Sequence, residues 1–319
     1  MIDNVDKDDP PILSIIIVSW NVRELLKACL SSIDQSRQAL PLEVIVVDSG
    51  SQDGSPSMVQ EDFPWVRLIA RPDNVGFPKG NNIGINKSRG RHILLLNPDT
   101  ELIGNGLLEM SRFLDDNLDV GVVAAKLLNP DGSVQSSRRR FPTIATGIFE
   151  STWLEPIAPR SILGNYYFED APDDVTGDVD WVVGACLMVR RSVVDDVGPL
   201  DEGYFMYSEE LDWCRRIKSA GWRVVYLPAS QIIHHTGKSS DQAVVERHLN
   251  FQRAKLRYFK KYHGSWAALL IRSILLINYA WQLVVEVLKG LIGHKRDLRW
   301  QRVRAYWTVL RSGLPPAGY

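Results

Sequence analysis

Five short apolar runs that are rich in β-branched residues alternate with helical patterns along the first 125 residues of the chain. The hydrophobicity of each run is continuous, which is typical of strands that are buried on both faces of a sheet. Strands separated by helices are joined by right-handed crossovers. The pattern therefore predicts an α/β fold with a mainly parallel sheet flanked by helices. The expected strands are 12–18, 43–48, 66–70, 92–97 and 120–125, and the expected helices are 22–33, 55–62, 79–88 and 105–117.

The pattern loosens between residues 126 and 180, where Arg138–Arg140 and several prolines predict a loop-rich excursion. Regularity returns with an expected strand at 180–191, a helix at 208–220, a strand at 223–228 and a helix at 242–262. A chain of this length suits one large domain with an appendage. We therefore expect one domain over residues 1–240 and a basic helical C-terminal region over residues 241–319.

The net charge of −1 conceals a strong asymmetry along the chain. Residues 1–252 carry 24 Lys/Arg against 36 Asp/Glu, which is −12, and residues 253–319 carry 13 against 2, which is +11. An acidic body with a basic tail predicts that the tail meets an anionic partner. The acidic start of the chain lacks the basic and apolar regions of a signal peptide. Three cysteines without paired close spacing also favour a reducing, cytoplasmic setting.

The segment from Trp266 to Gly293 is apolar enough for a membrane span, yet it contains Arg272, Asn278, Gln282, Glu286 and Lys289. At about 100° per residue these five side chains share an arc of roughly 120°. A span would bury charges at a cost of a few kcal/mol each, whereas an interfacial helix would leave them in water. We therefore expect a peripheral helix on an anionic membrane surface. Packing on the main domain or in a homodimer is the alternative, and nucleic acid is not expected as a partner.

Residues that follow the predicted strands are the first candidates for a site, because ligands of such sheets bind beyond the carboxyl ends of the strands. Asp48 lies there and can accept hydrogen bonds from a nucleobase N–H or a ribose hydroxyl; capping of the next helix is the alternative, and it fits Asp53 better. Asn97 and Asp99 follow the fourth strand and can hold Mg²⁺ or Mn²⁺ against a diphosphate. A simple Asn-Pro-Asp turn is the alternative there.

Three acids, Glu209, Glu210 and Asp212, stand at the start of a predicted helix. The helix dipole favours acids at this position in any protein. However, a run of aromatic residues precedes them, and such neighbours can raise the pKa of a carboxylate into the range of a general base. His234 and His235 follow the last strand of the body. Adjacent side chains point in different directions, so at most one of the two is expected to be a ligand.

Taken in order, these segments resemble the family 2 glycosyltransferases of the GT-A (Rossmann-like) fold, and in particular their bacterial rhamnosyltransferase-like branch. The resemblance covers roughly residues 12–240, about three quarters of the chain. Each motif alone is a weak signal, but five in the family's order are specific. The motifs are SIIIVSWN (14–21), VVDSGSQDGS (46–55), DNVGFPKGNNIGI (73–85), LLLNPDTEL (94–102) and GYFMYSEELDWCRRI (203–217).

The resemblance implies roles for individual residues. It makes Glu210 the catalytic base and Asp99 the principal metal ligand, with His234 as a second ligand or a diphosphate contact. The nucleotide-binding half would be about 12–125 and the acceptor half about 126–240. The donor-binding residues would be Ser19, Asn21, Asp48, Asn74, Gly76, Phe77, Asn81 and Asn97, and the acceptor-side residues would be Trp181, Gly184, Glu209 and Asp212. Two positions depart from the family pattern: Asn97 replaces an Asp of the metal motif, and Glu210 replaces the Asp of the catalytic Glu-Asp pair.

The implied activity is that of a metal-dependent, inverting hexosyltransferase in cell-surface polysaccharide synthesis. The sugar, rhamnose in preference, would pass from dTDP-rhamnose or a UDP-sugar to a hydroxyl of a glycan or polyprenyl-linked acceptor, at the inner face of the cell membrane. The two departures leave one alternative, a catalytically impaired nucleotide-sugar-binding membrane partner protein. The segment around Arg138–Arg140 is either a flexible cover that touches an anionic acceptor or a solvated run of charge.

Overall fold

The computed structural model describes residues 10–37, 39–235, 244–293 and 295–318. The chain forms two compact units. The first unit contains Met1–Arg139, Ala171–Asp201 and Glu210–Lys238, and the second contains Arg140–Asp170, Glu202–Glu209 and Ser239–Tyr319.

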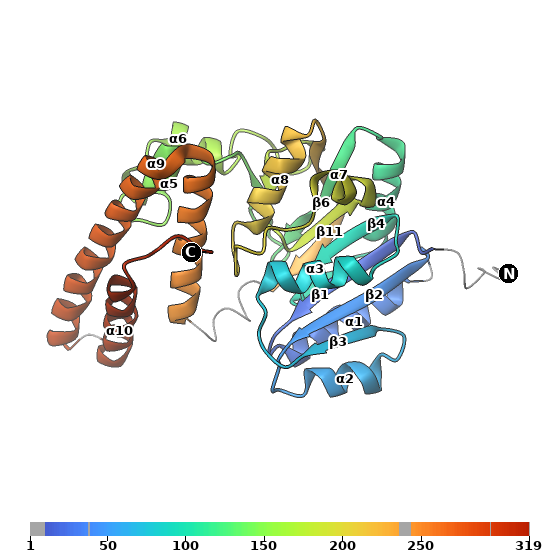
Figure 1. The fold of residues 1–319 in the computed structure, drawn as a ribbon, viewed down its shortest axis with the longest axis horizontal. Coiled ribbons are helices and arrows are strands. Elements are labelled where there is room, and N and C mark those ends of the chain that lie inside the picture. Colours follow the sequence, from blue (N-terminus) through green and yellow to red (C-terminus); the bar gives the residue numbers. More distant parts are fainter. Residues whose placement is uncertain (1–9, 38, 236–243, 294, 319) are drawn as a thin grey trace. The chain divides into compact units, whose positions relative to one another are not determined.

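A mixed sheet forms the centre of the first unit, with the strand order β3-β2-β1-β4-β10-β6-β11-β5 and β8 paired to β11 (Figure 1). Strands β3, β2, β1 and β4 are parallel, and β6 and β11 are parallel to each other. The bounds are β1 Leu13–Ser19, β2 Leu42–Ser49, β3 Arg67–Arg71, β4 His92–Leu96, β5 Thr100–Leu102, β6 Val120–Leu128, β8 Gly177–Asp178, β10 Cys186–Arg190 and β11 Arg223–His234. A separate pair joins β7 Arg138–Arg139 to β9 Trp181–Val182.

Helices cover both faces of this sheet, as the alternation of strands and helices predicts. Leu13, Ile15 and Ile17 of β1 belong to one core with apolar side chains of α1, α2 and α4. The intervening side chains of β1 point to the other face, where α3 lies so close that a Cβ at Gly84 would stand 2.4 Å from Ile16 Cγ2. The helices are α1 Arg23–Ser36, α2 Ser55–Asp62, α3 Phe77–Lys87, α4 Gly106–Asp116, α7 Arg191–Val197 and α8 Glu209–Ser219.

The expected strand at 180–191 is wrong as a single element. The chain forms β9, leaves the strand conformation from Val183 to Ala185, and then enters β10, which is antiparallel to both β4 and β6. Apolar side chains continue through the break, so the sequence pattern hides it. The strand expected at 223–228 is also longer than predicted, because β11 continues to His234 after a register shift between Leu227 and Gln231.

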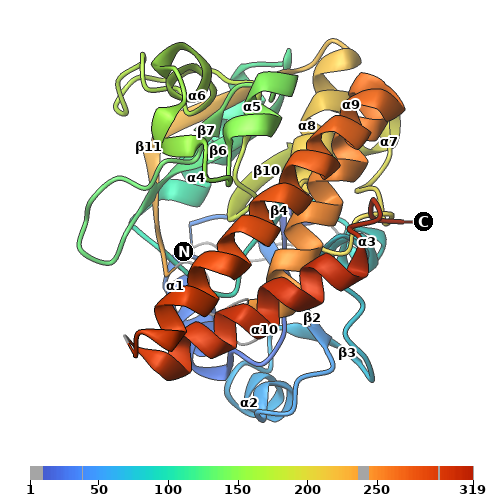
Figure 2. The same cartoon turned by 90° about the vertical axis from the view of Figure 1, so that its left-hand side faces the viewer.

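The second unit is helical. It contains α5 Ile144–Phe149, a 3₁₀ turn at Glu155–Ile157, α6 Arg160–Tyr166, α9 Val244–Leu291 and α10 Arg296–Ser312. Helix α9 breaks at Gly264, whose φ of 86° lies in the left-handed region that favours glycine. The two halves of α9 and α10 pack together through the rings of His248, Tyr279 and Tyr306 (Figure 2).

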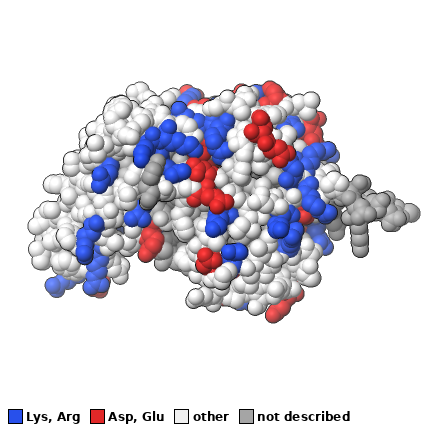
Figure 3. All heavy atoms as spheres, in the orientation of Figure 1, with Lys and Arg blue, Asp and Glu red and all other residues white. Residues whose placement is uncertain are grey.

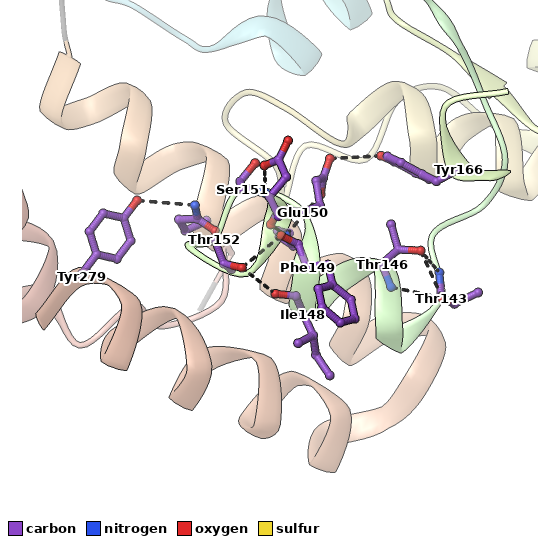
Figure 4. A network of polar contacts seen from close by, with 12 residues as sticks. Thr143, Thr146, Ile148, Phe149, Glu150, Ser151, Thr152, Tyr166 and Tyr279 are labelled. Atoms are coloured by element: carbon purple, nitrogen blue, oxygen red, sulfur yellow. Dashed lines mark hydrogen bonds and ion pairs between the residues drawn. The ribbon is translucent and has the colours of Figure 1, made fainter. Parts of the chain in front are cut away.

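A network of polar contacts holds α5 and the turn that follows it (Figure 4). Thr143 and Thr146 form a capping box at the start of α5, and Thr152 Oγ1 donates to the carbonyl oxygens of Ile148 and Phe149. Beside them, Lys255 Nζ of α9 lies 3.1 Å from Glu150 Oε2. These contacts fix α5 on α9 and bury polar groups of both segments.

The polar arc of the helix at 266–293 does not remain in water as expected. Asn278 is 1% exposed and Glu286 is 7% exposed. Asn278 Oδ1 accepts from the backbone N–H of Trp153, and Glu286 accepts two hydrogen bonds from Arg299 Nη1 of α10, at 2.9 and 2.8 Å. This part of the polar arc is therefore on the side on which α9 packs inside the second unit, whereas Lys289 of the same arc is exposed.

Candidate active site

The carboxyl ends of β1 and β2 place Ser19 beside Asp48 in the parallel register. Asp48 is 2% exposed, and its Oδ1 accepts from the backbone N–H of Ser51 at 2.9 Å. Asp48 Oδ2 and Ser19 Oγ are buried without a hydrogen-bond partner among the described residues. Because a buried unpaired acceptor costs free energy, this pair is suited to receive a donor group of a ligand such as a nucleobase N–H.

The loops after β1 and β2 are tied to each other. The backbone N–H of Asn21 donates to Ser51 Oγ at 2.9 Å, and Asn21 Oδ1 accepts from the N–H of Gln52 at 2.7 Å. Asp53 Oδ1 accepts from the N–H of Ser55 at the start of α2. Asp53 therefore satisfies the first N–H of α2, whose N-cap residue is Gly54, and the carboxylate of Asp48 is not used for this purpose.

The next predicted donor-binding residues surround the start of α3. Asn74 Oδ1 accepts from the N–H of Gly76, whose φ of 81° makes the turn into the helix. Asn81 Nδ2 donates to the carbonyl oxygen of Phe77 at 2.9 Å, and Asn81 is buried. These contacts shape the loop, and nucleotide contact by the four residues stays a prediction.

Asp99 and His234 meet where β5 and β11 pair antiparallel. His234 Nε2 lies 3.4 Å from Asp99 Oδ1, and both side chains are buried. The neighbouring His235 points elsewhere, with Nε2 at 2.6 Å from Glu101 Oε1. Asn97 Oδ1 is buried and has no hydrogen-bond partner among the described residues.

This donor set fits a divalent cation. Two ligands at neighbouring positions of an octahedral ion, with bonds of about 2.1 Å, lie about 3 Å apart, which is close to the observed distance between Asp99 Oδ1 and His234 Nε2. Within the described part of the chain no group of three or more His, Cys, Asp or Glu side chains is arranged for a metal ion. Two protein ligands leave coordination positions open for oxygens of a bound ligand and for water, as is usual for Mg²⁺.

Glu210 stands in the first turn of α8, and its carboxylate faces the break between β9 and β10. The N–H of Gly184 donates to Glu210 Oε1 at 3.3 Å, and Glu210 Oε2 is buried without a partner among the described residues. Burial raises the pKa of this carboxyl, and backbone N–H donors and the charge of Arg139 oppose the rise only in part. A carboxylate in this state is a competent proton acceptor.

The break also connects Glu210 to the metal-motif segment. Asn97 N–H donates to the carbonyl oxygen of Ala185, and Cys186 pairs with Leu96 across β10 and β4. Gly184, which contacts Glu210, therefore lies one residue before the partner of Asn97. The fold thus brings together segments that are about 110 residues apart in the chain.

The remaining acceptor-side residues have other surroundings. Asp212 is fully buried and accepts from Arg216 Nε at 3.0 Å within α8, so its carboxylate is engaged in an ion pair. Trp181 is buried in β9, opposite Arg139 of β7. Glu209 is the first residue of α8 and is buried.

The three arginines at 138–140 all donate hydrogen bonds to other groups of the protein, Arg139 to Ser136 and to the carbonyl oxygen of Arg138. Arg138 is buried; it pairs with Asp173 and stacks over the ring of Tyr226. In the second unit, Arg140 donates to both carboxylate oxygens of Asp170 at 2.9 Å. The interpretation as a flexible cover or a solvated run is therefore wrong for the buried Arg138, whereas the ion pair of Arg140 with Asp170 is exposed.

Sequence reasoning missed Gln135. Its Oε1 lies 2.6 Å from His234 Nδ1, and its Nε2 donates to Asn129 Oδ1. Gln135 belongs to the loop between β6 and β7 and follows no predicted strand end. No local pattern pointed to it.

The model of the family described as "Glycosyl transferase family 2" matches residues 14–198. The chain is 29% identical over 293 aligned residues to the N-acetylglucosaminyl-diphospho-decaprenol L-rhamnosyltransferase of Mycobacterium tuberculosis, with 83% of this chain and 94% of that protein covered. It is 32% identical over 173 residues to the rhamnosyltransferase WbbL of Escherichia coli K12, with 50% and 61% covered. Glu210 and His234 lie beyond the match to the family model.

Two solved structures share the fold. One is the mannosyltransferase PcManGT of Pyrobaculum calidifontis in complex with GDP-Man and Mn²⁺, with a TM-score of 0.55, 16% identity, and 96% of this chain and 87% of that chain covered. The other is GalNAc-T7 with UDP, GalNAc and Mn²⁺, with a TM-score of 0.58, 13% identity, and 96% and 57% covered. At such identities the likeness concerns the fold alone, which is GT-A in each case.

Proposed function

This chain belongs to glycosyl transferase family 2, and we propose that it is an inverting rhamnosyltransferase that uses dTDP-rhamnose and a lipid-linked glycan acceptor. Two relatives that are named as rhamnosyltransferases support rhamnose as the transferred sugar. The name of one of them contains a decaprenyl-diphosphate-linked substrate. A UDP-sugar is the second choice of donor.

The observation that carries the proposal is the environment of Glu210. One of its carboxylate oxygens accepts from the N–H of Gly184, and the other is buried without a partner among the described residues. A base with one oxygen fixed and one oxygen unpaired can take the proton of an acceptor hydroxyl. The hydroxyl oxygen then forms the bond to the anomeric carbon while the bond from that carbon to the diphosphate oxygen breaks. A single displacement inverts the anomeric configuration and requires no second nucleophile in the protein.

The donor would lie across the carboxyl ends of the strands. Asp48 and Ser19 would hold the base, and Asp99 and His234 would hold Mg²⁺ or Mn²⁺ against the diphosphate. When bound, the cation supplies positive charge that neutralises the charge developing on the departing nucleoside diphosphate. The protein's own contribution is to keep the ligand atoms of Asp99 and His234 within 3.4 Å of each other before the donor arrives.

The place of action in this proposal is the cytoplasmic face of a membrane. A lipid-linked acceptor is confined there, and the segment Val245–Leu291 is the one helix of the described residues that is long and apolar enough to cross a bilayer. Eight basic residues stand against two acidic ones between residues 266 and 313. An anionic surface would attract this region.

The test is a donor panel with purified full-length protein, Mn²⁺ and a short-chain polyprenyl-diphosphate-linked N-acetylglucosamine. We expect dTDP release from dTDP-rhamnose, and a product whose anomeric configuration by NMR is the opposite of the donor's. A preference for a purine-linked donor, or retention of configuration, would contradict the proposal. Tight donor binding without any turnover would favour the alternative of a catalytically impaired binding protein.

A further inference from the structure

The apolar side of helix α9 is exposed to solvent. In its second half, large apolar side chains recur every three or four residues on one face and remain exposed to solvent. Ile277 and Trp281 are 58% and 57% exposed, whereas Asn278 on the opposite face is 1% exposed. The exposed members are Trp266, Leu269, Leu270, Ile277, Trp281, Val284, Leu288 and Leu291, which we call the α9 stripe.

The α9 stripe is long and carries no charge. From Trp266 to Leu291 it extends over about 38 Å of helix at 1.5 Å per residue. Its other exposed members, Ser273 and Ala280, are small and uncharged. Contiguous exposed apolar surface of this extent marks an interaction site. Figure 3 shows the region of α9 and α10 as mostly uncharged surface with scattered basic side chains.

The surroundings of the stripe are cationic. Lys295 and Arg296 follow its end, and Arg304 and Arg311 are exposed on α10. Among the described residues of α10, Asp297 is the single acid. Basic side chains near an apolar face complement a bilayer with anionic headgroups. We infer that the α9 stripe rests on the acyl chains of an anionic bilayer, with these side chains among the headgroups.

The helix must lie along the surface rather than cross it. Helix α10 packs antiparallel on α9, since Arg299 reaches Glu286 and Arg272 Nε donates to the carbonyl oxygen of Gly313. A crossing α9 would therefore carry the exposed Arg304 and Arg311 of α10 into the hydrocarbon, where arginine is strongly disfavoured. Lying flat exposes only the stripe to the acyl chains.

Sedimentation with vesicles tests the stripe. Leu288→Glu should weaken binding of the full-length protein to vesicles of phosphatidylcholine with one fifth phosphatidylglycerol by at least tenfold. Leu118→Glu is the matched control, because Leu118 is a 74% exposed leucine of the first unit and should leave binding unchanged. The assay needs neither donor nor acceptor, so its failure leaves the proposed transferase activity untouched.

Two outcomes would overturn the inference. One is that the Leu288→Glu protein binds the vesicles as strongly as the wild-type protein does. The other is a wild-type dimer in solution that the same substitution converts to monomer, since the stripe would then be an interface between copies. Nitroxide labels at Leu270→Cys, Val284→Cys and Leu291→Cys should report equal depth, whereas a gradient would indicate a span. The native cysteines are buried, so these labels are selective.

A second inference, carried by different contacts, concerns Gln135 and rests on the proposed metal site. Gln135 Nε2 lies 3.4 Å from the backbone carbonyl oxygen of His234, and a carbonyl oxygen can only accept. The amide group must therefore present its N–H there and to Asn129 Oδ1, which leaves Oε1 facing His234 Nδ1 at 2.6 Å.

The orientation of this amide determines the tautomer of His234. Because Gln135 Oε1 can only accept, Nδ1 of the neutral ring carries the proton, and Nε2, which lies 3.4 Å from Asp99 Oδ1, carries the lone pair. The geometry points to Gln135 as a positioning residue that keeps His234 in the tautomer able to bind a cation. Such outer contacts change metal affinity by about 10–100-fold when they are removed.

The tautomer can be measured without metal, donor or acceptor. In protein labelled with ¹⁵N-histidine, we expect long-range ¹H–¹⁵N spectra to show the Nδ1–H form for His234, assigned by His234→Gln. Gln135→Leu should yield a mixture of tautomers and weaken Mn²⁺ binding, followed by electron paramagnetic resonance, by at least tenfold. Gln135→Glu keeps an acceptor for Nδ1 and should keep the proton on Nδ1, but its second oxygen replaces the N–H that faces the carbonyl oxygen of His234.

The Nε2–H tautomer in the wild-type protein would overturn this inference, as would unchanged Mn²⁺ affinity of the Gln135→Leu variant. His235→Gln serves as a control, because that ring faces Glu101 and should not alter the tautomer of His234. If His234→Gln itself leaves Mn²⁺ binding unchanged while the wild-type tautomer is Nδ1–H, the failure lies in the proposed metal site rather than in the role of Gln135.

Discussion

Replacement of Glu210 by glutamine should separate catalysis from donor binding and from stability. The amide keeps the size of the side chain and keeps an oxygen that can accept from the N–H of Gly184. It removes the proton acceptor. The contacts around Asp48 and Asp99 lie on other strands and are not changed.

The expected loss follows from the role of a positioned base. General base catalysis contributes about 10²–10⁴-fold, which is about 3–5 kcal/mol of transition-state stabilisation. We expect kcat for nucleoside diphosphate release to fall by at least about 10²-fold. The dissociation constant of the donor, measured by calorimetry with Mn²⁺, should change by less than about threefold, since the variant keeps the donor contacts.

The same substitution should stabilise the protein in a pH-dependent way. Burial raises the pKa of Glu210 above its ordinary value of 4.5, so the folded chain holds this proton more tightly than the unfolded chain. The wild-type protein therefore loses stability as pH rises from the unfolded to the folded pKa. Glutamine does not titrate, so the melting temperature of the variant should exceed that of the wild type at pH 8 and approach it near pH 4.

Two results would refute this reasoning. One is a loss of turnover in Glu209→Gln or Asp212→Asn while Glu210→Gln remains active, because the base would then be another acid of the same turn. The other is a variant that is less stable than the wild type at pH 8. Glu109→Gln is the matched control, since Glu109 is exposed on α4 and should alter neither activity nor stability.

Three further predictions concern single residues. Asp48→Ala should weaken donor binding in calorimetry by roughly 10–100-fold, the worth of a hydrogen bond to a charged group, with a smaller effect on kcat at saturating donor. Asp99→Ala should abolish the metal-dependent part of turnover, and full wild-type activity in excess EDTA would contradict the metal site. Gly84→Ala should lower the melting temperature, because its Cβ would stand 2.4 Å from Ile16 Cγ2 and such overpacking costs about 1–3 kcal/mol. Gly177→Ala, which meets nothing within 4 Å, is its control and should melt like the wild type.

The parallel strands in the first 125 residues could be predicted from the sequence, because a buried parallel strand has a continuous apolar pattern. The five apolar runs of the first 125 residues all form strands. Since carboxyl ends of parallel strands meet at one edge, Asp48 could also be placed beside Ser19 without coordinates.

Antiparallel insertion of β10 between β4 and β6 could not be predicted, because no local pattern records which strands pair. The consequence for the site is direct. The break before β10 brings Gly184 to Glu210, and that contact joins segments 26 residues apart. Gln135 is a similar case, since its contact with His234 spans 99 residues. Residues that support a site through such distant contacts cannot be recognised from the residues next to them in the sequence.

Helix α9 shows a different limit of sequence reasoning. Periodicity separates a polar from an apolar face, but the direction that each face takes depends on partners elsewhere in the chain. Here three polar groups in the second half of α9 have distant partners: Arg272 has the carbonyl oxygen of Gly313, Asn278 has the N–H of Trp153, and Glu286 has Arg299. With those partners in place, these polar side chains are hydrogen-bonded inside the second unit. The apolar side chains on the other side of the helix are exposed. An amphipathic helix that buries its polar side in protein therefore indicates an apolar environment on the opposite side, and in the inference that we draw for the α9 stripe this environment is the bilayer.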